Sequence, residues 1–225
     1  MIVAILVSVL WASGLTTERE AFLSWSDKQA MEIGESMRAN GRAGGWLDTR
    51  IVRTEHSYNY KLRATWLSPE VIRASARIHQ LHQGMDDEKT TELVGEAEGS
   101  GDTVILVEID PREGSGIIPN DWAAFLRPKG DGSSRAVPGA NHPELRNVKA
   151  LSGTYRRDYA YDLFWLVFPL VTSEGEPLFA DGDQEAELVV RVGGKEGRVS
   201  WKIPRSIRDR GREVASRRPD EGQKE

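Results

Sequence analysis

The sequence contains no cysteine, which excludes disulfide scaffolds, thiolate zinc sites and cysteine nucleophiles. It also lacks an excess of positive charge, because the 30 Lys and Arg are outnumbered by 35 Asp and Glu, which gives a formal net charge of −5. The clustered basic footprint of a nucleic-acid-binding protein is therefore not expected. The glycine patterns that bind dinucleotides or nucleotide phosphates are missing as well. The chain has 225 residues, of which 39% are apolar and seven are Trp, and this is enough for a folded core.

An apolar run opens the chain. Residues 2–12 are apolar except for Ser8. A bilayer core needs about 20 such residues and a secretory signal about 7–15, so the length favours a signal peptide. Ala12 and Gly14 supply small side chains for cleavage, although no Lys or Arg precedes the run. We expect residues 1–14 to direct export to the periplasm or the cell exterior, leaving no transmembrane helix in the mature chain. The alternative is a buried strand in a cytoplasmic protein.

Helical signals follow in two regions. In the N-terminal segment 15–48, a capping box begins at Ser26, and a helix, or two, is predicted up to about Asn40-Gly41, followed by a Gly-rich joint. In the region 69–99, Pro69 stands at the first helical position, and two helices are predicted. The first of these has an apolar stripe formed by Val71, Ala74, Ile78 and Leu81.

Strand signals dominate the rest of the region 49–204. Alternating or continuous apolar patterns predict strands at 58–66, 103–110, 121–128, 162–171, 186–192 and 198–204, with a further short strand at 153–159. The last long pair flanks Gly193-Gly194, a hairpin signal. Strand 162–171 is apolar on both faces, so it needs a cover on each side, and the helix at 69–83 is expected to supply one.

These elements predict a mainly β fold with α additions. The expected architecture is an antiparallel Ig-like β-sandwich of six to seven strands, with an N-terminal helix and the two-helix insertion 69–99 packed on a sheet. Trp165 and Trp201 are expected in its core. The charged segment 205–225 is expected to be a disordered tail.

A loose resemblance is carried by the signal-like run, the strand 58–66, the segments VILVEID, DWAAFLRP and DLFWLVFPLV, and the terminal hairpin. In these features the chain resembles exported bacterial proteins of unknown function with an Ig-like sandwich. The resemblance covers about half of the chain and includes no diagnostic motif. It implies a fold and a cell-envelope location, and no activity.

Two candidate metal sites are suggested by residue spacing. His79 and His82 lie three apart on one helix, where two imidazoles with a nearby carboxylate could hold a metal ion. Asp181, Asp183 and Glu185 alternate in a turn, an oxygen-rich pattern that suits Ca²⁺. Neither matches a complete motif, so solvent-exposed histidines and an ordinary inter-strand turn are the simpler interpretations, and no cofactor is assigned.

Catalytic and binding candidates are equally sparse. Glu108, Asp110 and Glu113 stand at a strand end, where paired carboxylates could serve as acid and base in a hydrolase. An aromatic and basic cluster could stack on a sugar or contact a protein, and consists of Tyr155, Arg156, Arg157, Tyr159 and Tyr161. No catalytic residue set is assigned. The leading hypothesis is a non-catalytic, exported protein-interaction module with an unknown protein or glycan partner and no nucleic acid. The alternatives are a glycan-binding module and a hydrolase.

Overall fold

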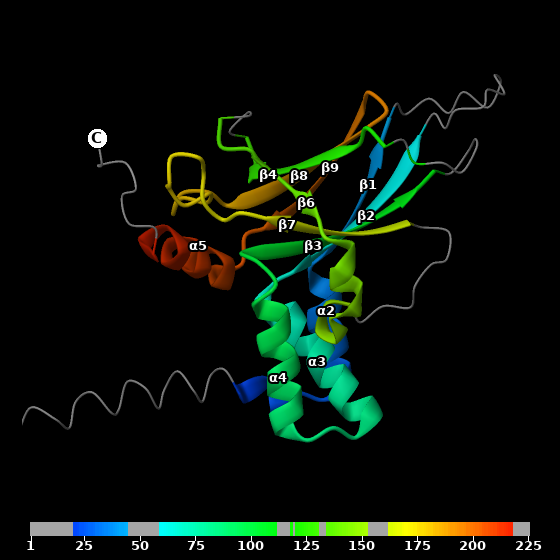
Figure 1. Cartoon of the computed structure of the whole chain (residues 1–225), viewed down its shortest axis with the longest axis vertical. Helices are drawn as coiled ribbons and strands as arrows, with labels where there is room; N and C mark the ends of the chain where they lie inside the picture. The colour runs from blue at the N-terminus through cyan, green and yellow to red at the C-terminus, as the bar shows by residue number, and fades with distance from the viewer. Residues whose placement is uncertain are drawn as a thin grey trace, which may run out of the picture.

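The computed structural model describes residues 20–44, 59–111, 118, 120–130, 134–152 and 162–217. Within this part of the chain, the structure is a nine-stranded antiparallel sheet with four α-helices and three short 3₁₀ helices (Figure 1). The strands are β1 (Arg38–Ala43), β2 (Tyr60–Leu67), β3 (Thr103–Asp110), β4 (Ala123–Pro128), β5 (Val137–Pro138), β6 (Ala140–Asn141), β7 (Asp162–Phe168), β8 (Glu185–Val192) and β9 (Lys195–Lys202). The helices are η1 (Ala21–Ser24), α2 (Asp27–Ser36), α3 (Pro69–Gln83), α4 (Asp87–Glu98), η2 (Pro143–Asn147), η3 (Lys149–Leu151) and α5 (Arg205–Arg217).

The strands form one nearly closed barrel, and the predicted six-to-seven-stranded Ig-like sandwich is wrong. The strand order is β5-β4-β8-β9-β1-β2-β3-β7-β6, so the two outermost strands are consecutive parts of the segment 137–141. β5 pairs with β4, and after Gly139 the same segment pairs as β6 with β7. A sandwich would leave these two edges in separate sheets, whereas here one short segment connects them.

Two glycines allow the backbone to approach closely where the sheet closes. A Cβ at Gly139 would lie 2.6 Å from the Phe168 ring, and the Gly139 amide donates to the Ala124 carbonyl at 2.9 Å. A Cβ at Gly197 would lie 2.5 Å from Leu62 Cδ1 and 2.6 Å from the Arg42 carbonyl oxygen, at the junction of β9 and β1. Real Cβ atoms essentially never make contacts this short, so a side chain at either position would force its neighbours to shift where the sheet closes.

The barrel interior is filled by side chains that alternate along the strands. The inward face of β3 carries Ile105, Val107 and Ile109, all of them buried in the main apolar cluster. Trp66 and Trp201 meet near one end of the barrel with ring centroids 5.6 Å apart. Because aromatic rings occupy this interior, the described strands enclose a packed core.

A second apolar layer lies outside the barrel, where α3, α4, η2 and η3 cover β3 and β7. Val71 and Ile72 of α3 share a cluster with Leu106 and Trp165. The expectation that the helix at 69–83 covers an outer sheet face is therefore confirmed, and Figure 1 shows α2, α3 and α4 grouped on one side of the barrel. Leu81 does not take part, because it is 41% exposed.

The rest of the α3 stripe packs on the N-terminal helix instead of the sheet. Ala74 and Ile78 form a small cluster with Ala30 of α2. The capping box predicted at Ser26 is present, since its hydroxyl accepts from the Gln29 amide and the Gln29 side chain accepts from the Ser26 amide. The N-terminal helical segment is thus anchored to α3 by apolar contacts.

The two Trp expected in one core are buried on opposite faces of the sheet. Trp201 points into the barrel, while Trp165 lies in the outer cluster, where its indole Nε1 donates to the Leu151 carbonyl at 3.0 Å. Their burial is confirmed, with exposures of 4% for Trp165 and 6% for Trp201. Their placement in a common core is wrong, because residue 165 faces outward under η3.

Two further segments differ from the sequence expectation. The helix expected up to Asn40-Gly41 ends at Ser36, and residues 38–43 form β1, which pairs with β2 over its whole length. The segment expected to be a frayed tail forms α5 over Arg205–Arg217, with Ile207 buried against the barrel core. In the described ranges, no helix is both long and apolar enough to cross a membrane. Residues 1–14, expected to be a signal peptide, lie outside the described residues.

Candidate functional site

The histidine pair predicted on α3 contacts two different elements. His79 Nε2 donates to the Lys149 carbonyl at 3.1 Å, and the Gln83 side-chain amide lies 3.4 Å from His79 Nδ1. His82 Nε2 instead lies 3.2 Å from an Asp27 carboxylate oxygen of α2. Burial lowers the pKa of His79, opposed in part by the hydrogen bond to Lys149. The two imidazoles therefore hold neighbouring helices together and do not converge.

The three acidic residues at the predicted calcium turn each form an ion pair with a different basic side chain. Asp183 forms a two-pronged pair with Arg135 at 2.8 and 3.1 Å. Asp181 pairs with Arg212 of α5, and Glu185 pairs with Lys129. Across the described ranges, no group of three or more His, Asp or Glu is arranged to hold a metal ion.

The strand-end carboxylates do not line either pocket described below. Glu108 is 5% exposed and pairs with Arg63 of β2 at 3.4 Å on the outer face of the sheet. Asp110 lies two residues further along the same face of β3. Glu113 and the cluster Tyr155, Arg156, Arg157, Tyr159 and Tyr161 lie outside the described residues. The exposed His142 and Glu144 side chains form a pair at 2.7 Å.

A pocket of about 520 Å³ opens on the outside of the barrel, between α4 and α5. Gly95 of α4 and Gly99, which caps that helix, line the pocket together with Asp209, Glu213 and other α5 residues. A Cβ built at Gly95 meets no atom within 4 Å, so the helix leaves open space there. Charged residues form more than half of its lining, beside Pro69, Val214 and the two glycines, and this mixture suits a protein segment more than a lipid or drug-like molecule.

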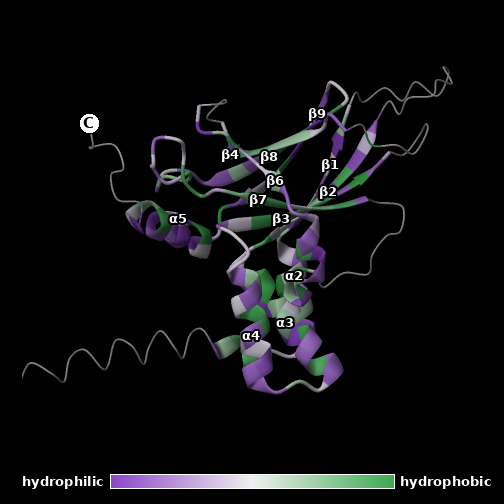
Figure 2. Cartoon of the chain, viewed as in Figure 1, coloured by the Kyte–Doolittle hydropathy of each residue, from purple (hydrophilic) through white to green (hydrophobic). Residues whose placement is uncertain are grey.

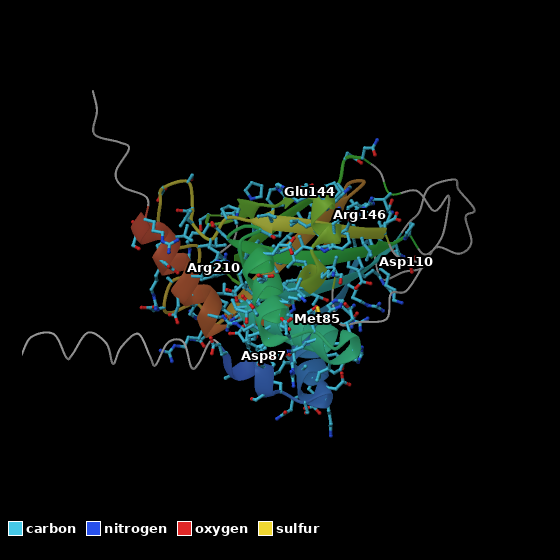
Figure 3. All side chains as sticks on the ribbon, turned by 60° about the horizontal axis from the view of Figure 1, so that its bottom comes forward. Met85, Asp87, Asp110, Glu144, Arg146 and Arg210 are labelled. Atoms are coloured by element: carbon cyan, nitrogen blue, oxygen red, sulfur yellow. The ribbon has the colours of Figure 1, made fainter. Side chains whose placement is uncertain are left out.

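Two arginines connect the elements that line this pocket. Arg210 of α5 donates to the carbonyl oxygens of Glu98 and Gly101, at the C-terminal end of α4. Arg73 of α3 pairs with the Glu98 carboxylate at 3.0 Å. Carbonyls at a helix C-terminus lack helical partners and carry partial negative charge, so these cations are favourable there. Figure 3 shows Arg210 on α5 next to α4, away from Asp87 at the start of α4.

A second pocket, of about 510 Å³, lies between η1 and α4. Its lining is acidic, with Glu20 from the residue before η1 and three carboxylates from α4, together with Leu23 and Thr91. The α4 carboxylates are Asp87, Glu88 and Glu92. Both pockets therefore lie along α4, one near each end of the helix.

Comparisons with known proteins leave the chain without a named relative. No family model, no curated protein and no solved structure matches it.

Sequence reasoning missed the surface formed by α4 and α5. Arg210 is missed because the segment 205–225 reads as a disordered charged tail, and Gly95 is missed because a single glycine in a helix carries no mark of a pocket. A helical signal was present, since Ile207, Gly211 and Val214 recur at intervals of four and three residues. The many arginines between them concealed this sparse apolar face.

Proposed function

We propose that this chain is a non-catalytic protein-interaction module, and that the α4–α5 face is its binding surface. The proposal is based on the positions of the pockets, which lie outside the barrel and not in its interior. Aromatic and aliphatic side chains fill the barrel, whereas both pockets described above flank α4 on the outside. A polar, solvent-open groove between two helices is suited to contacting a segment of another protein.

The disposition of the ionisable groups supports binding over catalysis. The hydroxyl of Ser206, which lines the α4–α5 pocket, donates to the Glu70 carboxylate at 3.0 Å, and no His lines this pocket. Arg73 and Arg210 in the same pocket are engaged with Glu98 and its neighbours. A nucleophile, a base and a group that orients the base do not meet at this groove.

The alternatives draw less support from the described residues. A hydrolase would need its carboxylates at an open cleft, yet Glu108 is buried in an ion pair. A glycan-binding module would present a planar row of aromatics, yet Trp165 and Trp201 are buried on opposite faces of the sheet.

Site-specific photo-crosslinking tests the proposal. A benzophenone amino acid is placed at Gly95, where open space accommodates it, and as a control at the exposed Glu174, which lines neither pocket described above. We expect a discrete adduct from position 95 and none of the same mass from position 174. An excess of the unlabelled wild-type chain should suppress this adduct, whereas an excess of the Gly95→Trp chain, with its groove filled, should not.

The Gly95→Trp variant should fold, because glycine is about 0.5 kcal/mol or more worse than most residues inside a helix and the added side chain meets open space. The proposal is overturned if position 95 gives no adduct, if both positions give the same adducts, or if the folded Gly95→Trp chain competes as well as wild type.

A further inference from the structure

Helix α5 is attached to the barrel by a small apolar contact. Of its thirteen residues, Ile207 and Gly211 are buried, and glycine has no side chain to pack. Ile207 joins the barrel core, whereas α3 buries a row of hydrophobic side chains from Val71 to Ile78. Figure 2 shows α5 mostly in the colours of hydrophilic residues. Because burial of apolar surface is the main force between packed elements, α5 is held to the barrel less firmly than α3.

Arginine side chains supply much of the remaining attachment. On one side of α5, Arg208 donates to the Ala180 carbonyl at 2.8 Å, in the loop that precedes β8. On the other side, Arg210 donates to the Gly101 carbonyl at 2.8 Å, in the connection between α4 and β3. Hydrogen bonds weaken steeply with distance and angle, so these contacts are lost together once the whole helix shifts by about 1 Å.

The connectivity lets α5 leave the barrel without disturbing the sheet. The helix follows β9 after Ile203 and Pro204, and within the described part of the chain it pairs with no strand. The sheet is closed by the pairing of β5 with β4 and of β6 with β7. Figure 1 shows α5 at the side of the barrel, apart from the group formed by α2, α3 and α4. Rotation in the link after Ile203 therefore frees α5 without breaking a hydrogen bond between strands.

We propose that α5 is a latch, which docks on the barrel and undocks from it as one unit while the nine-stranded sheet stays folded. Undocking removes one wall of the α4–α5 pocket, because six of its twelve lining residues belong to α5. The pocket therefore exists only in the docked state, and a partner that binds there holds the latch closed. This control of binding rests on the proposed function, whereas the motion of α5 does not.

Hydrogen–deuterium exchange of the full chain, followed by NMR, measures the motion. Amides that exchange through a local opening are less protected than amides that exchange only when the whole domain unfolds. The protection factors of the hydrogen-bonded amides of α5 should be similar to one another, because the helix opens as a unit. They should be at least about tenfold lower than those of β3 in the centre of the sheet.

Two glutamine variants on the same helix test the arginine anchor. Arg210→Gln weakens the contacts with the carbonyls beyond α4, and it should lower the protection of the α5 amides at least about fivefold. The amides of β3 should stay within about twofold of wild type. Arg205→Gln is the matched control, because the Arg205 side chain is 95% exposed, and it should leave both sets of amides within about twofold.

A double variant tests the control of the pocket. Ile207→Ala with Arg210→Gln removes the apolar and the polar anchor together, and should leave the α5 amides unprotected while those of β3 stay protected. The benzophenone at position 95 should then lose the adduct that it forms in the wild-type background.

Four results would overturn the inference: α5 amides as protected as those of β3, equal effects of the two glutamine variants, a double variant in which the sheet unfolds together with α5, or an undiminished adduct from the double variant. The proposed function is judged separately. If α5 opens as described and position 95 gives no adduct in the wild-type background, the proposed function fails and the motion of α5 stands.

Discussion

At the scale of single residues, His79 shows how a polar side chain holds two elements together. Its imidazole lies between α3 and η3, donating to the Lys149 carbonyl, and it is half-buried. Burial disfavours the charged form and lowers the pKa of His79. The positive charges of the Lys149 side chain and of His82 also lower this pKa, whereas the hydrogen bond to the Lys149 carbonyl opposes the shift. Ion pairs connect elements in a similar way. Asp181, Asp183 and Glu185 pair with Arg212, Arg135 and Lys129, respectively.

The first prediction concerns the pH dependence of this contact. A histidine whose pKa is lower in the folded than in the unfolded state stabilises the fold fully above its unfolded pKa, about 6.5, and this contribution is lost as the pH falls through the folded pKa. The free energy of unfolding of His79→Gln should therefore lie below that of wild type at pH 8, with the gap narrowing towards pH 5. Urea unfolding of both chains measures this gap, and a constant gap from pH 8 to pH 5 would contradict the assigned role.

At the scale of elements, α3 is the helix that joins the barrel to the N-terminal segment. Val71 and Ile72 pack on the outer face of the sheet, while Ala74 and Ile78 pack on α2. One helix thus serves two apolar surfaces, because its buried residues span more than one narrow stripe. The exposed end of the stripe, Leu81, lies beyond both contacts.

The second prediction tests this helix. Ile78 is 8% exposed, so Ile78→Asp would bury a carboxylate without a partner and should lower the free energy of unfolding by several kcal/mol, of the order of 3. Leu81→Asp on the same helix should change it by no more than about 0.5–1 kcal/mol, because Leu81 is 41% exposed. Denaturant titration of both variants decides the matter, and equal effects would mean that α2 does not cover α3 in solution.

At the scale of the whole molecule, closure of the sheet decides the architecture. The segment 137–141 pairs with β4 on one side and β7 on the other, so both outer strands are protected. The closed wall separates a packed interior from an outer surface on which α3, α4 and α5 lie, and both pockets occur on that outer surface. The proposed binding surface lies on the helices because of this division.

The third prediction tests closure. Gly139→Val would place side-chain atoms within contact distance of the Phe168 ring, and overpacking of this kind costs about 1–3 kcal/mol. In the matched substitution Gly182→Val the added Cβ meets no atom within 4 Å, and the free energy of unfolding should change by less than about 0.5 kcal/mol. Thermal unfolding followed by circular dichroism compares the two, and a Gly139→Val chain as stable as wild type would argue against the closed segment.

The local pattern of the sequence determined most of the individual elements. β3 was expected at 103–110 and α3 at 69–83, and the structure has them there, as it has the hairpin turn at Gly193-Gly194. Such elements are encoded by the alternation and spacing of neighbouring side chains, which a single stretch of sequence displays. The apolar character of β7 on both faces likewise indicated a helical cover.

Only the tertiary structure decided how these elements combine and where the proposed binding surface lies. β5 and β6 have two residues each, too few for any periodic signal, yet their pairing turns an expected sandwich into a nearly closed barrel. α5 becomes a wall of the candidate site because Ile207 meets the barrel core and Arg210 meets the end of α4, contacts made across more than a hundred residues of sequence in the case of Arg210. Strand pairing and helix docking depend on partners distant in the chain, so a local pattern such as that of α5 can indicate a helix but not which residues it meets to form the site.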